Sequence, residues 1–333
     1  MAKRKTKKKS KKYSTETFLK YLVWVLSIIA LFLVLFLAGY YFGYNSAKDE
    51  IDSKLAQKEK QTKEALDKLE KVVKQKQNLN KKLENILKKE QKKYDVTAAH
   101  EIEDKKALEP RIKKPHLSST KPKLAIIFDD VSTKSQVKAI KSLNLKVTLS
   151  FFPPSKSHPN TPKLASKEKF YMIHLPMEAM HFSKEEPFTL RANDSRYTIE
   201  QRIKKIKKLF PRTKFINNHT GSKFTSDKRA VKNLIYVLDK YNIKFVDSRT
   251  TSKTKVPIVM KEQGRKYLAR DVFLDHKGDE ASIIKQIKLA VKLAKRYGYA
   301  IAIGHPHPST ILALAKSKKL LEQVDLVYVY EIH

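Results

Sequence analysis

Carboxylate and imidazole side chains recur directly after short apolar runs of this sequence. Asp129 and Asp130 follow LAIIF, and His174 follows YMI. His219 ends the stretch FINNH, and His305 follows AIAIG. Two imidazoles and one carboxylate can hold a divalent metal with one position open, a neighbouring acid can take a proton from water, and a further imidazole can protonate a leaving amine. The pattern therefore indicates metal-assisted hydrolysis.

A structural interpretation of the same residues stays open. An Asp ahead of a helix at 133–143 is a normal N-cap, and a single His after a strand is often structural. The glycines favour the functional interpretation, because Gly221 follows His219 by two residues and Gly304 directly precedes His305. Glycine at such points permits unusual backbone angles or the close approach of a ligand, and the prolines of GHPHP stiffen that loop.

The elements that must position these residues are apolar runs alternating with amphipathic stretches. Continuous apolar strands separated by helices are typical of a parallel α/β sheet or barrel, which carries its site at the C-terminal strand ends. About 210 residues suit one barrel. The expected strands are Leu124–Phe128, Val147–Phe152, Phe170–Ile173, Phe215–Ile216, Phe245–Val246, Tyr267–Leu268, Ala300–Ile303 and Leu326–Val329. The expected helices lie near 133–143, 198–209, 227–241, 280–297 and 309–320.

Composition excludes several classes of protein. The 333 residues include no Cys, which excludes a disulfide scaffold, a thiolate zinc site and a Cys nucleophile, so a metal must use His, Asp or Glu. The chain has 7 Gly and lacks the glycine motifs that cradle phosphates. A net charge of +37 suits nucleic acid, but the Lys residues are dispersed and no RRM, KH or zinc-finger pattern occurs. We therefore expect a solvated Lys-rich surface and no nucleic-acid partner.

A membrane segment is expected at residues 21–44, which form a 24-residue run without charge. At about 1.5 Å per residue this run spans roughly 36 Å as a helix, enough for a bilayer core of about 30 Å. Residues 1–20 hold nine basic residues against one acidic residue, which predicts a cytoplasmic N-terminus and an extracytoplasmic remainder. A cleaved signal peptide is the alternative, but its apolar region is shorter, about 7–15 residues. We expect an uncleaved single-pass anchor in the inner membrane.

A helical stalk is expected at residues 45–94, and a linker at 95–122. The stalk lacks Pro, and apolar residues recur at alternating steps of three and four, which favours a parallel coiled coil and a homodimer. A single solvated helix used as a spacer is the alternative. The linker lacks periodicity and contains three prolines. The seam positions are Ile51, Leu55, Lys58, Thr62, Ala65, Leu69, Val72, Lys76, Leu79, Leu83 and Ile86.

The stretches AIIFDD, IHLPME, INNHTGS with FT, FVDSRT, RDVFLD and AIGHPHPST occur in this order between Lys123 and His333. In this respect the segment 123–333 resembles the divergent polysaccharide deacetylase family, a branch of the polysaccharide deacetylase superfamily. The resemblance implies an α/β fold, a distorted (β/α) barrel. It also implies a divalent metal, for which Zn²⁺ is expected.

The resemblance also implies roles for individual residues. In the wider superfamily the first of two paired acids is the base and the second binds metal, which implies Asp129 as base and Asp130 as ligand. The superfamily's usual H-[ST]-x-x-x-H motif is absent, and in the divergent branch the strand bearing His174 takes its place. The resemblance therefore implies His174 and His219 as the other ligands, and His305 as the acid. Further residues match the branch motifs and are expected around the metal or the substrate: Asn218, Ser222, Asp247, Arg249, Asp271, Asp275 and His307.

Three functions are compatible with this pattern. The first is a membrane-anchored, metal-dependent deacetylase that acts on N-acetyl or other acyl groups of a cell-envelope polysaccharide or peptidoglycan-like glycan. The second is a non-catalytic envelope module whose barrel binds a glycan or a partner. The third is a nucleic-acid-associated protein, which an extracytoplasmic domain disfavours.

Overall fold

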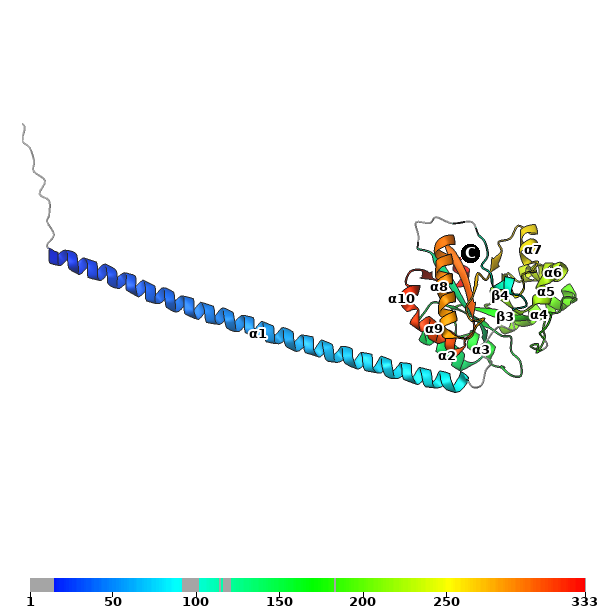
Figure 1. The fold of residues 1–333 in the computed structure, drawn as a ribbon, viewed down its shortest axis with the longest axis horizontal. Coiled ribbons are helices and arrows are strands. Elements are labelled where there is room, and N and C mark those ends of the chain that lie inside the picture. Colours follow the sequence, from blue (N-terminus) through cyan, green and yellow to red (C-terminus); the bar gives the residue numbers. More distant parts are fainter. Residues whose placement is uncertain (1–14, 92–101, 114, 116–120, 183, 333) are drawn as a thin grey trace, which may run out of the picture. The chain divides into compact units, whose positions relative to one another are not determined.

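The computed structural model describes residues 15–91, 102–113, 115, 121–182 and 184–332. The chain divides into two compact units, with the boundary between Glu84 and Asn85. The first unit contains the long helix α1 up to Glu84, and the second contains the sheet with its helices (Figure 1).

Helix α1 spans Thr15–Gln91 without interruption. By length and composition it can cross a membrane, and its apolar window is not buried by any other part of the described chain. Trp24 and Tyr40, for example, are largely exposed. Exposed apolar surface of this extent is unfavourable in water, so this part of the helix suits a lipid or protein environment. The helix also covers the proposed stalk as far as Gln91, and residues 92–94 lie outside the described residues. The coiled-coil pairing of the stalk stays a prediction.

The second unit is built on a parallel sheet of nine strands. Eight of them form the order β6-β5-β4-β3-β2-β1-β8-β7, and β9 pairs with β1. Because all pairs are parallel, the C-terminal strand ends meet at one edge. The strands are β1 Lys123–Val131, β2 Thr148–Phe151, β3 Tyr171–Met177, β4 Phe215–Thr220, β5 Lys244–Asp247, β6 Leu268–Ala269, β7 Val272–Phe273, β8 Tyr299–Gly304 and β9 Asp325–Leu326.

The barrel is open at one seam. Strands β6 and β7 occupy the two ends of the strand order, and no pairing within the described residues joins them. They are nevertheless consecutive in sequence, separated only by Arg270 and Asp271. This parallel-sheet half-barrel confirms the distorted (β/α) barrel expected from the sequence.

Helices surround the sheet (Figure 1), and side chains cap several of their N-termini. Thr133 forms a capping box with Gln136 at α2, so Asp129 and Asp130 are not N-caps. Asp227 and Asp279 cap α6 and α8. The helices are α2 Lys134–Ser142, α3 Thr161–Ala165, α4 Arg196–Leu209, α5 Ser222–Ser226, α6 Lys228–Lys240, α7 Val256–Glu262, α8 Glu280–Tyr297, α9 Pro308–Lys316 and α10 Lys318–Leu321, with 3₁₀ turns η2 Lys105–Leu108 and η3 Val329–Ile332.

Two apolar clusters follow from the alternation of side chains along the strands. Leu124 and Ile126 of β1 pack with the helices in the larger cluster. Ala125 and Ile127 point the other way, into a smaller cluster with Met172 of β3. Strand β1 is therefore buried on both faces, which explains why it reads as a continuous apolar run.

Residues 102–113, which we call the strap, pack on this unit although they lie within the expected linker. Ala107 is fully buried, and Leu108 packs against the smaller apolar cluster. Arg111 and Lys113 each pair with the buried carboxylate of Asp271 at 2.9 Å. Since Asp271 lies between β6 and β7, the strap covers the open seam. Of the rest of the expected linker, 95–101, 114 and 116–120 lie outside the described residues.

Sequence analysis did not predict several short elements and placed one strand incorrectly. Strand β7, helices α3, α5 and α7, and the 3₁₀ turns were not expected, because segments of two to seven residues carry little periodicity. The expected strand Leu326–Val329 is wrong in extent. Its strand part is β9, Asp325–Leu326, and Val329 begins η3 instead.

Candidate metal centre

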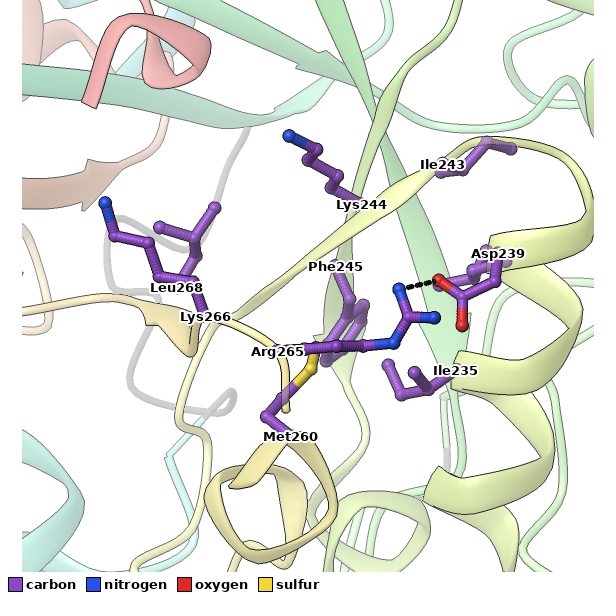
Figure 2. Close-up of a pocket in the computed structure, with 10 residues that line it drawn as sticks. Ile235, Asp239, Ile243, Lys244, Phe245, Met260, Arg265, Lys266 and Leu268 are labelled. Atoms are coloured by element: carbon purple, nitrogen blue, oxygen red, sulfur yellow. Dashed lines mark ion pairs between the residues drawn. The ribbon is translucent and has the colours of Figure 1, made fainter. Parts of the chain in front are cut away.

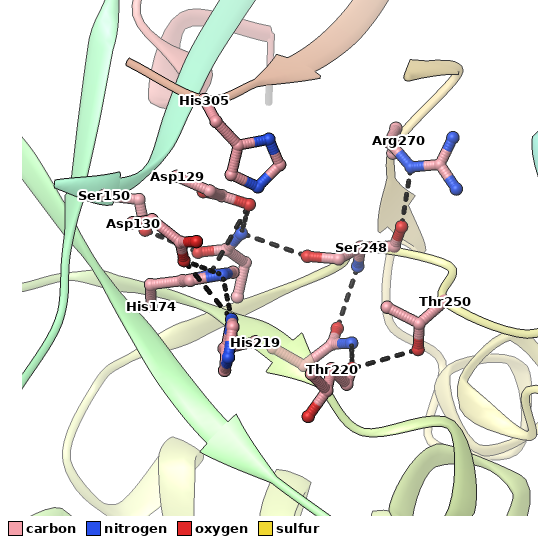
Figure 3. Close-up of polar contacts among 12 residues, drawn as sticks. Asp129, Asp130, Ser150, His174, His219, Thr220, Ser248, Thr250, Arg270 and His305 are labelled. Carbon is pink, nitrogen blue, oxygen red and sulfur yellow. Dashed lines mark hydrogen bonds and ion pairs between the residues drawn. The ribbon is translucent and has the colours of Figure 1, made fainter. Parts of the chain in front are cut away.

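Asp130, His174 and His219 bring three potential ligand atoms together, Asp130 and His219 from the C-terminal ends of β1 and β4 and His174 from the middle of β3 (Figure 3). Nε2 of His174 lies 3.3 Å from Oδ1 of Asp130. Nδ1 of His219 lies 3.2 Å from the same oxygen and 3.2 Å from Nε2 of His174. Ligand atoms about 2.0–2.2 Å from one tetrahedral ion lie about 3.3–3.6 Å apart. The three residues therefore fit a metal of the size of Zn²⁺.

The backbone of β1 explains how two adjacent acids both reach this edge. Side chains of a regular strand alternate between faces. Here the register with β2 shifts between Phe128 and Val131, and Asp130 adopts φ = 55°. Asp tolerates this left-handed region better than most residues. The irregularity turns the carboxylate of Asp130 toward the histidines, while Asp129 stays buried beside them.

Asp129 is held by neutral donors and lies beside one imidazole. Its Oδ2 accepts a 2.7 Å hydrogen bond from Nδ2 of Asn217 and lies 3.5 Å from Nδ1 of His174. Asn217 also contacts the hydroxyls of Ser150 at 2.6 Å and Ser248 at 3.0 Å. The orientation of the Asn217 amide follows from chemistry, because a carboxylate requires the donor nitrogen to face it.

Sequence reasoning selected Asn218 and missed Asn217. Asn218 instead donates to the carbonyl of Thr220 at 2.6 Å and accepts from the backbone N–H of Ser248 at 2.8 Å, which fixes the loop after β4. The signal that identifies Asn217 is the period of two in a strand: Asn217 and His219 lie on the same face.

His305 is buried at the end of β8, next to β1. The register pairs Phe128 with Gly304, so Asp129 and His305 follow on neighbouring strands. Nδ1 of His305 lies 3.0 Å from Oδ1 of Asp275, whose Oδ2 accepts from the backbone N–H of His305 at 2.6 Å. Figure 3 shows the imidazole on the side of Asp129. The Nδ1 contact fixes the ring, with Nε2 on the opposite edge from Asp275.

The charge of Asp275 is stabilised within the fold. Burial by itself raises the pKa of this carboxyl, but the charge of His305 and hydrogen bonds from His305 and Thr310 hold the pKa below its ordinary value. Asp275, His305 and His307 could also form a metal-binding group by proximity. The first group suits a metal better, because both oxygens of Asp275 already accept hydrogen bonds from this loop.

Two glycines permit the close approaches at these strand ends. A Cβ on Gly304 would lie 3.2 Å from Cβ of Leu274 and 3.3 Å from Oδ2 of Asp275. Gly221 has φ = 88°, and its Cβ would lie 2.9 Å from Cβ of Met177. A side chain at Gly221 would be strained by this contact and by the left-handed backbone, and one at Gly304 would require its neighbours to shift.

Other expected site residues bind parts of the protein away from the three ligand atoms. Ser222 donates to Glu103 of the strap at 2.6 Å. Asp247 accepts from Tyr267 at 2.8 Å. Arg249 donates to the carbonyl of Glu109, also on the strap. Together with Asp271, which pairs with Arg111 and Lys113, these residues fix loops and the strap; His307 is the N-cap residue of α9.

A separate pocket of about 200 Å³ lies between α6, α7 and the starts of β5 and β6 (Figure 2). Its rim carries the ion pair Asp239–Arg265 at 2.5 Å, with Lys244 and Lys266 nearby. Burial raises the pKa of Asp239 despite this partner. The pocket contains none of the expected site residues, because it lies by the N-terminal rather than the C-terminal strand ends.

Comparison with known proteins matches residues 126–333 to a family model described as divergent polysaccharide deacetylase. An uncharacterized protein of Haemophilus influenzae is 32% identical over 213 residues, covering 63% of this chain and 76% of that protein. The uncharacterized protein YibQ of Escherichia coli is 36% identical over 200 residues, covering 58% of this chain and 61% of that protein. The crystal structure of an uncharacterized Agrobacterium tumefaciens protein shares the fold, with a TM-score of 0.57 at 21% identity, covering 66% of this chain and 92% of that one.

Proposed function

Since this chain belongs to the divergent polysaccharide deacetylase family, we propose that its barrel is a metal-dependent hydrolase that removes acetyl or related acyl groups from a cell-envelope glycan. The convergence of Asp130, His174 and His219 within 3.3 Å of one another is the observation that carries the proposal. Asp129 and His305 follow the paired residues Phe128 and Gly304 of the neighbouring strands β1 and β8, and they are the proposed base and acid.

The chemistry follows from the positions of these side chains. A divalent ion held by Asp130, His174 and His219, Zn²⁺ by its preference for imidazole and carboxylate, would polarise the acyl carbonyl and acidify water. Asp129 takes the proton of the attacking water, and Asn217 keeps its carboxylate in place. Nε2 of His305 delivers a proton to the amine nitrogen as the C–N bond breaks. Asp275 holds Nδ1 and favours the protonated imidazole that this step needs.

The test is acetate release by the full-length protein in detergent micelles, with acetylated chito-oligosaccharides and peptidoglycan as substrates. Asp129→Asn should retain the metal, and its rate of acetate release should fall about 10²–10⁴-fold, because a general base contributes a factor of that size. His219→Ala should lose the metal itself, measured by elemental analysis. Metal binding without acetate release on either substrate would instead favour a glycan- or partner-binding module.

The location of this activity is also part of the proposal. The apolar segment of α1 and the basic residues before it support a single-pass anchor with the barrel outside the cytoplasmic membrane. Protease added to spheroplasts should then remove the barrel and leave a membrane-bound N-terminal fragment. Full protection of the barrel would contradict the topology, and recovery of a chain lacking α1 would indicate a cleaved signal sequence.

A further inference from the structure

Phe152, directly after β2, packs on both histidines of the candidate metal centre. Its ring centroid lies 4.8 Å from that of His219, at an interplanar angle of 79°. It lies 5.5 Å from the ring of His174, at 50°. The two imidazoles are themselves 5.0 Å apart at 72°. The three rings therefore contact one another in a single group.

The packing of Phe152 differs from that of its neighbour Phe151. Phe151 is fully buried, belongs to the apolar core between sheet and helices, and meets the ring of Tyr171 at 6.3 Å. Phe152 is only 7% exposed, yet it belongs to neither apolar cluster of the described structure. A buried phenylalanine normally joins the core, so contact with polar imidazoles requires its own explanation.

A third histidine also packs on Phe152. The ring of His158 lies 5.2 Å from that of Phe152 at 30°, and His158 is 8% exposed. Nε2 of His158 lies 3.1 Å from the carbonyl oxygen of Pro153 and 3.6 Å from a carboxylate oxygen of Glu186. Nδ1 on the other edge of the ring lies 2.9 Å from the hydroxyl of Ser157, so both ring nitrogens hold His158 against Phe152.

An imidazole can bind a metal only when its ring orientation is held. The ligand atoms of His174 and His219 must stay about 3.3 Å apart, and rotation about the side-chain bonds would separate them. Hydrogen bonds are the usual means of fixing such rings, and an aromatic contact on both rings achieves the same constraint by sterics. We infer that Phe152 is a positioning residue for the metal centre, with His158 as its support. This inference depends on the proposed metal-binding function.

The experiment compares Phe152→Leu with Phe151→Leu in the full-length protein. Both variants remove one aromatic ring from adjacent positions, but only the first removes a ring from the histidines. Zinc affinity is measured by competition with a chromophoric chelator, and the visible spectrum of the Co²⁺-loaded protein reports the coordination geometry. Amide hydrogen exchange of β1 and β4 shows whether each variant is folded.

We expect Phe152→Leu to lose about 10–100-fold in zinc affinity, the size of effect seen for residues that orient ligands, and to change the Co²⁺ spectrum. Phe151→Leu should keep both, even if it unfolds more readily. Equal affinities for the two variants and the unaltered protein would overturn the inference while leaving the metal centre intact. Equal losses in both would also overturn it, since they would reflect general destabilisation. If the unaltered protein binds no divalent metal, the proposed function fails together with the inference.

Discussion

The side-chain nitrogen of Asn217 lies 2.7 Å from a carboxylate oxygen of Asp129, and both residues are fully buried. They come from strands that are not neighbours, since β3 and β2 separate β4 from β1. The bond therefore crosses the end of the barrel rather than running along the sheet. The Asn217 amide is a neutral donor, and its hydrogen bond orients the carboxylate of the proposed base.

Replacing Asn217 tests this orientation. Asn217→Ala removes the donor and lets the Asp129 carboxylate turn, which should lower acetate release by about 10²-fold, the cost of misplacing a reacting group by about 1 Å. Zinc affinity should not change. Asn218→Ala is the matched control, because the amide of Asn218 bonds the backbone of Thr220 and Ser248 rather than Asp129. A similar fall in rate in both variants would show that the loss reflects loop disorder instead.

The strap should be essential for the stability of the barrel. Asp271 is fully buried, and its partners Arg111 and Lys113 are largely buried as well. Arg111→Gln with Lys113→Gln leaves this charge buried without its cations, which should cost about 3–5 kcal/mol. The measurement is hydrogen exchange of β7 and β8 at rising denaturant. Lys105→Gln with Lys106→Gln, exposed on the same strap, is the control and should change stability by less than about 0.5 kcal/mol.

The pH dependence of stability should include a contribution from Asp275. Its pKa in the folded protein lies below the ordinary value of 3.8, so it binds a proton less readily than in the unfolded chain. Its stabilising contribution is therefore complete above about pH 4 and is lost as the pH falls through the folded pKa. Asp275→Asn should lower the denaturation midpoint at pH 7, and the difference from the unaltered protein should shrink toward pH 3. A difference that stays constant over this range would contradict the prediction.

The stalk should dimerise the chain if its apolar seam is used. Ile51, Leu55 and Leu69 lie on α1 as exposed side chains in a single chain, and pairing would bury them. A peptide covering 45–95 should then become more helical with rising concentration and show a dimer mass by ultracentrifugation. Leu55→Lys with Leu69→Lys should abolish this dependence. A monomer mass with unchanged helicity would support the single-helix spacer.

The local pattern of apolar and polar residues was sufficient to predict most of the long helices and strands. Helix α8 at Glu280–Tyr297 has the bounds expected from its amphipathic period, and its N-cap Asp279 is a sequence signal. The apolar run Leu124–Phe128 similarly identified the core of β1. These elements are predictable because their patterns repeat over neighbouring residues. The placement of Asp130, His174 and His219 at one edge also follows from parallel strands, once family resemblance had selected them.

Tertiary structure alone decided the features that depend on distant contacts. Residues 102–113 lack periodicity, and they are ordered by partners such as Asp271, which lies 160 residues from Arg111. The left-handed backbone of Asp130 depends on the register shift between β1 and β2. Phe151 and Phe152 are the same type of residue at adjacent positions, and they differ only in which side chains they contact after folding. A one-dimensional pattern records the polarity of each residue, but not which distant group supplies its contact.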